Sequence, residues 1–273
     1  MPKIVGILNL TPDSFSGDGA ERLSKSELCK RIENMIDEGA DIIDVGAEST
    51  APNSKDVSVK EELKRLESIF DVINKKKYSN TIFSIDTRNS ETAKKGIQAG
   101  AKMINDVSGG RNDKGMFKVV ADSRVKYVMM HCKNPNGKAD LIKKNKDIFS
   151  GIIDFFDKQI ETAVSFGIKK EDIILDPGMG AFVSPNAEDS IEILRRIPEL
   201  KKRYNLPIYI GASRKGFLSK LVNKDFGVKD RVGASLATAL FAVNQGANYV
   251  RVHDILETKQ IIEAWEVLKS YKF

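Results

Sequence analysis

Two short motifs carry polar side chains that can recognise a flat heterocycle. SIDT (84–87) places Asp86 at the end of an apolar run, where a buried carboxylate requires a compensating partner. That partner is a heterocycle with ring N–H groups, an arginine or backbone amides. INDVSGG (104–110) contains Asn105, whose amide offers a donor and an acceptor in one plane and suits an aminopyrimidinone. A hydrogen-bonded turn is the structural alternative for this second motif.

Two further motifs combine a rigid turn or a helix start with a charged side chain. LDPGMG (175–180) places Asp176 where it can read the amino and N–H edge of a base-like ligand, or cap a turn. In GASRKGF (211–217), Ser213 and neighbouring backbone N–H groups can hold an anion at the start of a short helix. Lys215 can donate to a ligand carbonyl or ring nitrogen, or belong to a surface Arg-Lys pair.

The two ends of the sequence carry candidate anion-binding residues. In RVHD (251–254), strand alternation sends Arg251 and His253 to the same face, where they can clamp a pyrophosphate. The arginine can also stack on a flat ring. In LNLTPDSFS (8–16), Asn9 can hold a metal or a phosphate oxygen, or stabilise a turn.

Other catalytic and metal-binding patterns are missing from the sequence. His131 and Cys132 are adjacent in a predicted strand and therefore point to opposite faces, which argues against a Cys–His dyad. There is no CxxC, HExxH, P-loop or GxGxxG motif, so we do not expect a metal cage made by the protein alone. Asn9 and substrate phosphates can still share a Mg2+ ion.

These motifs follow short runs rich in Ile and Val that alternate with segments of helical period. Such alternation predicts βα units, a parallel sheet and an α/β fold. We predict strands at 3–10, 41–48, 81–87, 102–109, 126–132, 173–179, 207–213 and 249–254. We predict helices at about 24–38, 58–76, 89–99, 115–123, 145–166, 187–204, 231–245 and 256–271.

Eight strands, each followed by a helix, predict a single (β/α)8 TIM barrel that spans residues 1–273 as one domain. Several helices end in Gly-Ala (EGAD, AGAK, QGAN), and glycine there suits a left-handed cap. The polar residues lie at the opposite ends of the strands. In this fold the carboxyl ends of the strands form the active-site face, so we expect the motifs to meet at one mouth.

The composition is that of an ordinary globular protein, with 41% hydrophobic and 30% charged residues. Two cysteines and no apolar run long enough to span a bilayer predict a cytoplasmic protein without a membrane partner. The net charge is +6, but lysines alternate with glutamates along helical segments such as KEELKRLESIFDVINKKKY. We therefore interpret the charge as a solvated surface that steers small anions, rather than as a nucleic-acid site.

Taken in order, ILNLTPDSFS, DIIDVGAEST, SIDT, INDVSGG, MH, LDPGMG, SRK and RVHD resemble the dihydropteroate synthase family, nearly from end to end. The resemblance implies a transferase of folate biosynthesis. It would condense 6-hydroxymethyl-7,8-dihydropterin pyrophosphate with 4-aminobenzoate, giving 7,8-dihydropteroate and pyrophosphate. The family commonly forms homodimers, and the apolar last helices (ATALFAV, IIEAWEVL) offer a face for one or pack on the barrel.

The resemblance also implies a role for each matching residue. Asn9 would bind Mg2+ and pyrophosphate, and Arg251 would cover the pterin ring and hold the pyrophosphate with His253. The remaining substrate-binding residues would hold the pterin (Asp86, Asn105, Asp176 and Lys215) or lie near the aminobenzoate (Thr50, Phe182 and Ser213). The catalytic set is then Asn9, Lys215, Arg251 and His253.

Three departures from the family pattern surround the expected aminobenzoate pocket. Ala51 stands where arginine is usual, with Lys55 as a possible but less suitable substitute because an ammonium lacks the planar fork. Gly17 and Asp18 look exchanged or shifted. In GMGAFVSPNAEDS, Phe182 is displaced by one position and the usual lysine is absent. This stretch resembles sulfonamide-insensitive members, which suggests reduced sulfonamide binding.

Two other functions remain open from the sequence. A pterin-dependent methyltransferase domain would share the Asp and Asn contacts, but it would have no pyrophosphate for SRK and RVHD to bind. A non-catalytic pterin-binding protein would follow if Ala51 and the altered loops had lost aminobenzoate. Turnover of purified substrates distinguishes this second alternative from a synthase.

Overall fold

The computed structural model describes residues 1–11, 23–50, 52, 54–141, 147–222 and 227–271. Within them, parallel strands form one eight-stranded sheet in the order β6-β5-β4-β3-β2-β1-β8-β7. Their bounds are β1 (Lys3–Asn9), β2 (Ile42–Gly46), β3 (Ile82–Asp86), β4 (Met103–Asp106), β5 (Lys126–Met130), β6 (Ile173–Asp176), β7 (Tyr209–Ile210) and β8 (Tyr249–Val252).

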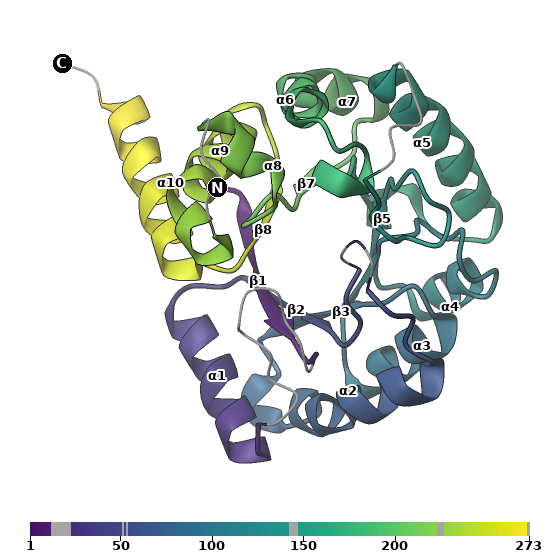
Figure 1. Ribbon diagram of the computed structural model, residues 1–273. Coiled ribbons are helices and arrows are strands. Elements are labelled where there is room, and N and C mark those ends of the chain that lie inside the picture. Colours follow the sequence, from purple (N-terminus) through teal and green to yellow (C-terminus); the bar gives the residue numbers. More distant parts are fainter. Residues whose placement is uncertain (12–22, 51, 53, 142–146, 223–226, 272–273) are drawn as a thin grey trace.

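The two end strands of this order meet and close the sheet into a barrel. Leu175 of β6 forms a parallel bridge with Ile208, and its N–H donates to the Pro207 carbonyl at 2.9 Å. Helices surround the ring of strands (Figure 1). The predicted (β/α)8 barrel is therefore confirmed.

The helices form the outer layer and pack the larger hydrophobic core against the outside of the barrel. Their bounds are α1 (Lys25–Asp37), α2 (Val59–Ile73), α3 (Ser90–Ala99), α4 (Met116–Ser123), α5 (Ile148–Ser165), α6 (Ala187–Arg195), α7 (Ile197–Tyr204), α8 (Phe217–Leu221), α9 (Val232–Asn244) and α10 (Ile255–Ser270). Gly39, Gly100 and Gly246, which end three of the predicted helices, all have positive φ, as the Gly-Ala pattern indicated.

The structure corrects two of the predicted elements. The helix expected at 187–204 is divided at Arg196, because Pro198 in the first turn of α7 has no N–H to continue the α6 ladder. The strand expected at 207–213 is reduced to Tyr209–Ile210, with Pro207 before it and Gly211 after it. The first change divides one helix into two and the second shortens a strand, and neither alters the order of the strands.

Inside the barrel, side chains change from apolar to polar along the strand direction. One apolar layer consists of Val5, Ile42, Met103, Val128, Ile174 and Tyr209, separate from the helix-facing core. Because strand side chains alternate, residues two positions further along face the same interior. Those positions include Asp44, Asn105 and Asp176, and Arg251 follows Tyr249, which packs against the layer, in the same way. The barrel therefore has an apolar floor and a polar mouth.

Within the described part of the chain, no helix has both the length and the apolar character needed to cross a membrane.

Candidate functional site

Arg251 of β8 lies at the centre of an ion-pair cluster in the barrel mouth. Its Nε donates to Asp44 Oδ2 at 2.7 Å, and Nη2 donates to Asp86 Oδ2 at 2.8 Å. The Asn105 side-chain N–H donates to the same Asp44 oxygen at 2.9 Å. Four strands thus contribute one residue each to a connected cluster. Of the partners expected for the Asp86 carboxylate, the structure shows an arginine of the protein itself, Arg251.

Several buried polar atoms of this cluster make no hydrogen bond with the described residues. They are Oδ1 of Asp44 and Oδ1 of Asn105, with the hydroxyls of Ser84 and Tyr209 in the same interior. Buried polar groups in proteins nearly always find partners. These free acceptors and hydroxyls therefore suit a polar ligand with several N–H groups.

Asp176 and Lys215 form a second part of the mouth. Asp176 Oδ1 accepts from the N–H of Gly178 at 2.8 Å, and Lys215 Nζ donates to the Met179 carbonyl at 3.3 Å. Gly178 has φ +75°, and a Cβ there would lie 2.3 Å from the His131 carbonyl oxygen. Only glycine permits this close turn, which directs Asp176 toward the interior.

Burial shifts the pKa values of three charged groups in this mouth, Asp86, Asp176 and Lys215, toward neutrality. It raises the pKa of Asp86 to about 7, although Arg251 opposes the shift, and the pKa of Asp176 to about 6, although Lys215 opposes it. Burial also lowers the pKa of Lys215 to about 8 against the attraction of Asp176. Shifts of this kind are typical of ligand-binding and catalytic sites.

Ser213 and His253 meet just beyond the ends of β7 and β8. Ser213 Oγ lies 3.0 Å from His253 Nδ1, and it accepts from the His253 backbone N–H at 3.2 Å. Next to it, Arg214 adopts φ +57°, a left-handed conformation held by the Ser235 hydroxyl and by an ion pair with Asp254. These contacts fix the direction of the His253 ring beside a helix start.

Asn9 and Thr50 lie at the same end of the barrel. Asn9 is in register with Gly46, Gly46 with Asp86, and Asp86 with Asn105, so they form one row across four strands. The Thr50 carbonyl accepts from the Ala139 N–H at 3.1 Å. The ring of Phe182 lies under the Lys215 ammonium, at 4.3 Å from its centroid.

The sequence-predicted site residues thus lie together at the carboxyl ends of the strands, but two details differ from expectation. Asp44, which the motif interpretation did not assign to the site, is the residue that joins Arg251 to Asn105. The inward alternation of an otherwise apolar strand was the signal for it. In INDVSGG the hydrogen-bonded turn is present, because Asp106 accepts from the Ser108 backbone N–H and hydroxyl, while Asn105 faces the interior and bonds to Asp44. Ala51, Gly17 and Asp18 lie outside the described residues.

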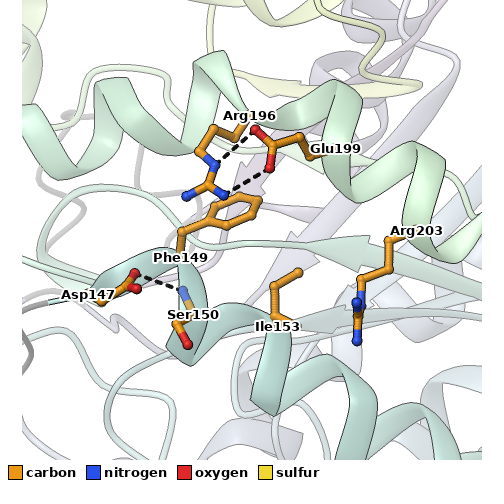
Figure 2. Close-up of a pocket in the computed structure, with 7 residues that line it drawn as sticks. All are labelled: Asp147, Phe149, Ser150, Ile153, Arg196, Glu199 and Arg203. Atoms are coloured by element: carbon orange, nitrogen blue, oxygen red, sulfur yellow. Dashed lines mark hydrogen bonds and ion pairs between the residues drawn. The ribbon is translucent and has the colours of Figure 1, made fainter.

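A surface groove of about 350 Å³ lies elsewhere, between the start of α5 and α7 (Figure 2). There Arg196 lies over the Phe149 ring and pairs with Glu199, and Asp147 caps α5. The groove shares no residue with the barrel mouth, and its charged groups already have protein partners: Arg196 pairs with Glu199, Arg203 with Asp157, and Asp147 accepts from the Ser150 N–H. The barrel mouth is therefore the better candidate for the site.

Comparison with known proteins agrees with this placement. Residues 5–253 match the family described as "Pterin binding enzyme", so the fold and site define a pterin-binding barrel enzyme. The chain is 37% identical over 271 residues to an Escherichia coli protein named dihydropteroate synthase type-3, with 99% of each chain covered. Two solved structures of Xanthomonas albilineans dihydropteroate synthase, one with 4-aminobenzoic acid and one with 7,8-dihydropteroate, match with TM-scores of 0.88 and 0.83. Each is 31% identical to this chain, and each match covers 99% of this chain. The match covers 94% of the chain with 4-aminobenzoic acid and 95% of the chain with 7,8-dihydropteroate. The chain belongs to the dihydropteroate synthase family.

The pKa shifts predict how ligand binding depends on pH. Asp86 and Asp176 attract N–H donors most strongly when they are ionised, because protonation removes the charge and converts one oxygen into a donor. Lys215 donates as a full cation only when protonated. Affinity for a pterin should therefore be highest between about pH 7 and pH 8, weakening below as Asp86 and then Asp176 become protonated, and above as Lys215 loses its proton. Calorimetric titration with the dihydropterin pyrophosphate across this range measures it, and Lys215→Met should lose the alkaline decline. An affinity independent of pH would contradict the assignment.

Proposed function

We propose that this transferase joins the methylene carbon of 6-hydroxymethyl-7,8-dihydropterin pyrophosphate to the amino nitrogen of 4-aminobenzoate. The products are 7,8-dihydropteroate and pyrophosphate, within folate biosynthesis. The observation that carries the proposal is the Asp44–Arg251–Asp86–Asn105 cluster beside Asp176 and Lys215, because it offers a pterin donors and acceptors on several sides. The solved relative that contains 4-aminobenzoic acid supports the second substrate.

The pterin is proposed to lie across the mouth, above the apolar floor. Asp86, Asn105 and Asp176 would accept from its amino and ring N–H groups, and Lys215 would donate to its carbonyl or ring nitrogen. Arg251 would cover the ring while Asp44 holds its Nε at 2.7 Å and Asp86 its Nη2 at 2.8 Å. Arginine suits this position because its planar guanidinium both pairs with carboxylates and stacks on rings.

Catalysis is proposed to depend on departure of the pyrophosphate. Its C–O bond to the pterin methylene breaks while Arg251, His253 and Ser213 stabilise the charge that develops on the leaving group. Nearby carboxylate charge stabilises the cationic methylene. The arylamine nitrogen then attacks this carbon and releases a proton, and an amine attacking a cation requires no deprotonated general base. These residues provide the binding and the electrostatics, and the substrates provide the reacting groups.

Mg2+ is the proposed metal, with the Asn9 side-chain oxygen as its ligand from the protein. Among the residues that the structure describes, no group of three His, Cys, Asp or Glu side chains could hold a metal ion. A site with one protein oxygen therefore fits a cation that commonly keeps waters and binds substrate phosphates. The ion would neutralise charge on the departing pyrophosphate.

The altered loops suggest a reshaped aminobenzoate pocket with reduced sulfonamide affinity. Two of the three departures lie outside the described residues, at Ala51 and at Gly17 and Asp18. Lys55, the candidate substitute for the missing arginine, is exposed. The third departure leaves Phe182 half-buried against Lys215. The shape of this wall, rather than the pterin contacts, would separate 4-aminobenzoate from a sulfonamide.

A homodimer in the cytoplasm is the proposed state of the enzyme. Exposed large apolar side chains lie on the last two helices, which offers a face for a second copy. They are Phe241 on α9 and Leu256, Val267 and Leu268 on α10.

Turnover tests the proposed function directly. The purified enzyme should form 7,8-dihydropteroate from both substrates with Mg2+, measured by steady-state assay. Lys215→Ala should lower kcat/KM by about 100-fold, since a charge-assisted donor in a partly dry site is lost. Lys220→Ala, on the neighbouring α8, removes an exposed ammonium that donates to the Pro185 carbonyl outside the barrel mouth, and this variant should remain active. Pterin binding without turnover would support the non-catalytic alternative.

Inhibition by sulfamethoxazole tests the reshaped pocket. We expect an inhibition constant at least about tenfold above that of the dihydropteroate synthase of Escherichia coli K12, a 35% identical relative, assayed in parallel. The KM for 4-aminobenzoate should be similar in both enzymes. Equal inhibition constants beside equal KM values would refute the hypothesis.

A further inference from the structure

Arg88, just after β3, joins the β3 end to a second loop of the barrel mouth. Its Nε donates to Glu48 Oε2 at 3.0 Å and its Nη2 to Glu48 Oε1 at 2.7 Å, a bidentate pair. The side chains of both residues are less than a tenth exposed, at 9% and 6%. A buried bidentate pair fixes orientation as well as distance. Glu48 begins the segment 48–57, which contains Thr50.

The same guanidinium reaches a third loop. Nη1 of Arg88 donates to the Asn136 carbonyl at 2.5 Å, and Nη2 also pairs with Asp56 at 3.0 Å. One side chain therefore contacts the ends of segment 48–57 and the segment 133–140. A lysine could not make this set, because its ammonium is a single point rather than a planar fork.

Lys138 adds a second link between these segments. Its ammonium donates to the Ser54 carbonyl at 2.9 Å and pairs with Asp56 at 2.8 Å. Next to it, the Ala139 N–H donates to the Thr50 carbonyl at 3.1 Å. The backbone of Thr50 is thus held directly by the segment that Arg88 also contacts.

The base of Arg88 is itself anchored. Buried Glu62 of α2 accepts from the Thr87 hydroxyl at 2.6 Å, from the Asn89 side chain at 2.8 Å and from the Thr92 hydroxyl at 2.7 Å. This fixes the turn between Asp86, which faces the pterin side, and Arg88, which faces the loops. The two sides of the mouth are therefore connected through one short, well-bonded turn.

We propose that Arg88 is a positioning residue for the second substrate. It holds the Thr50 segment at a set distance from the Asp86 pocket, so the affinity for 4-aminobenzoate, rather than for the pterin, depends on it. This inference rests on the proposed function. Arg88 contacts neither substrate in this account and acts through Glu48 and the Asn136 carbonyl.

The test separates the two KM values. Arg88→Met should raise the KM for 4-aminobenzoate about tenfold, because hydrogen bonds to a charged group are lost, and should leave the KM for the pterin pyrophosphate nearly unchanged. Arg88→Lys keeps the positive charge but loses the planar guanidinium, and should raise the KM for 4-aminobenzoate by a similar factor. Arg196→Met, which breaks a partly exposed bidentate pair with Glu199 outside the mouth, is the control and should leave both KM values native.

Lys138→Met keeps the test decisive if loss of the buried pair prevents folding. It removes the contacts of Lys138 with the Ser54 carbonyl and exposed Asp56 and a longer 3.9 Å pair with Glu48, while Glu48 keeps its bidentate pair with Arg88. This variant should raise the 4-aminobenzoate KM selectively. Two results would overturn the proposed role of Arg88 while leaving the proposed function intact. One is a native KM for 4-aminobenzoate in every variant that folds, and the other is a native KM in Arg88→Lys. A native enzyme without turnover would instead overturn the proposed function.

Discussion

The ion pairs that Arg251 makes inside the barrel are the interaction on which the site depends. One guanidinium holds Asp44 and Asp86 on neighbouring strands, and Asp44 in turn holds Asn105. Removing charges from water is costly, so such a cluster is weak evidence for added stability. Removing only one partner, however, destabilises a protein by about 3–5 kcal/mol, because it leaves a buried charge uncompensated. The cluster therefore specifies one arrangement of the mouth.

The barrel supplies the conditions for this arrangement. The apolar floor excludes water beneath the cluster, and burial moves the pKa values of Asp86, Asp176 and Lys215 toward neutrality. The turns after the strands then direct the remaining groups, through glycine at 178 and the left-handed backbone of Arg214. A pterin site, an anion site and a loop-bound aminobenzoate site can thus share one mouth.

The sequence predicted the barrel well because hydrophobic periodicity decides which segments become strands and helices. It failed where proline acts locally, at Pro198 between two short helices and at Pro207 before a short strand. Motif order placed Asp86, Asn105, Asp176 and Arg251 at one mouth, since topology gathers the strand ends. Periodicity cannot show which inward residues touch, so Asp44 was left unassigned. Arg88 also lacked a signal, because a charged residue after a strand resembles a solvated one until its buried partners are known.

Binding of the dihydropterin pyrophosphate to Asp44→Asn is the most direct test of the central claim. The substitution keeps the size of the side chain but removes the charge that anchors Arg251. Calorimetry should show affinity weakened by at least about tenfold, with a lower Tm, because Arg251 loses the opposing charge at its Nε and the amide introduced at position 44 adds a donor among existing donors. Asp71→Asn, which loses an exposed pair with Lys25, should behave like the native protein. Native affinity and an unchanged Tm for Asp44→Asn would contradict the account.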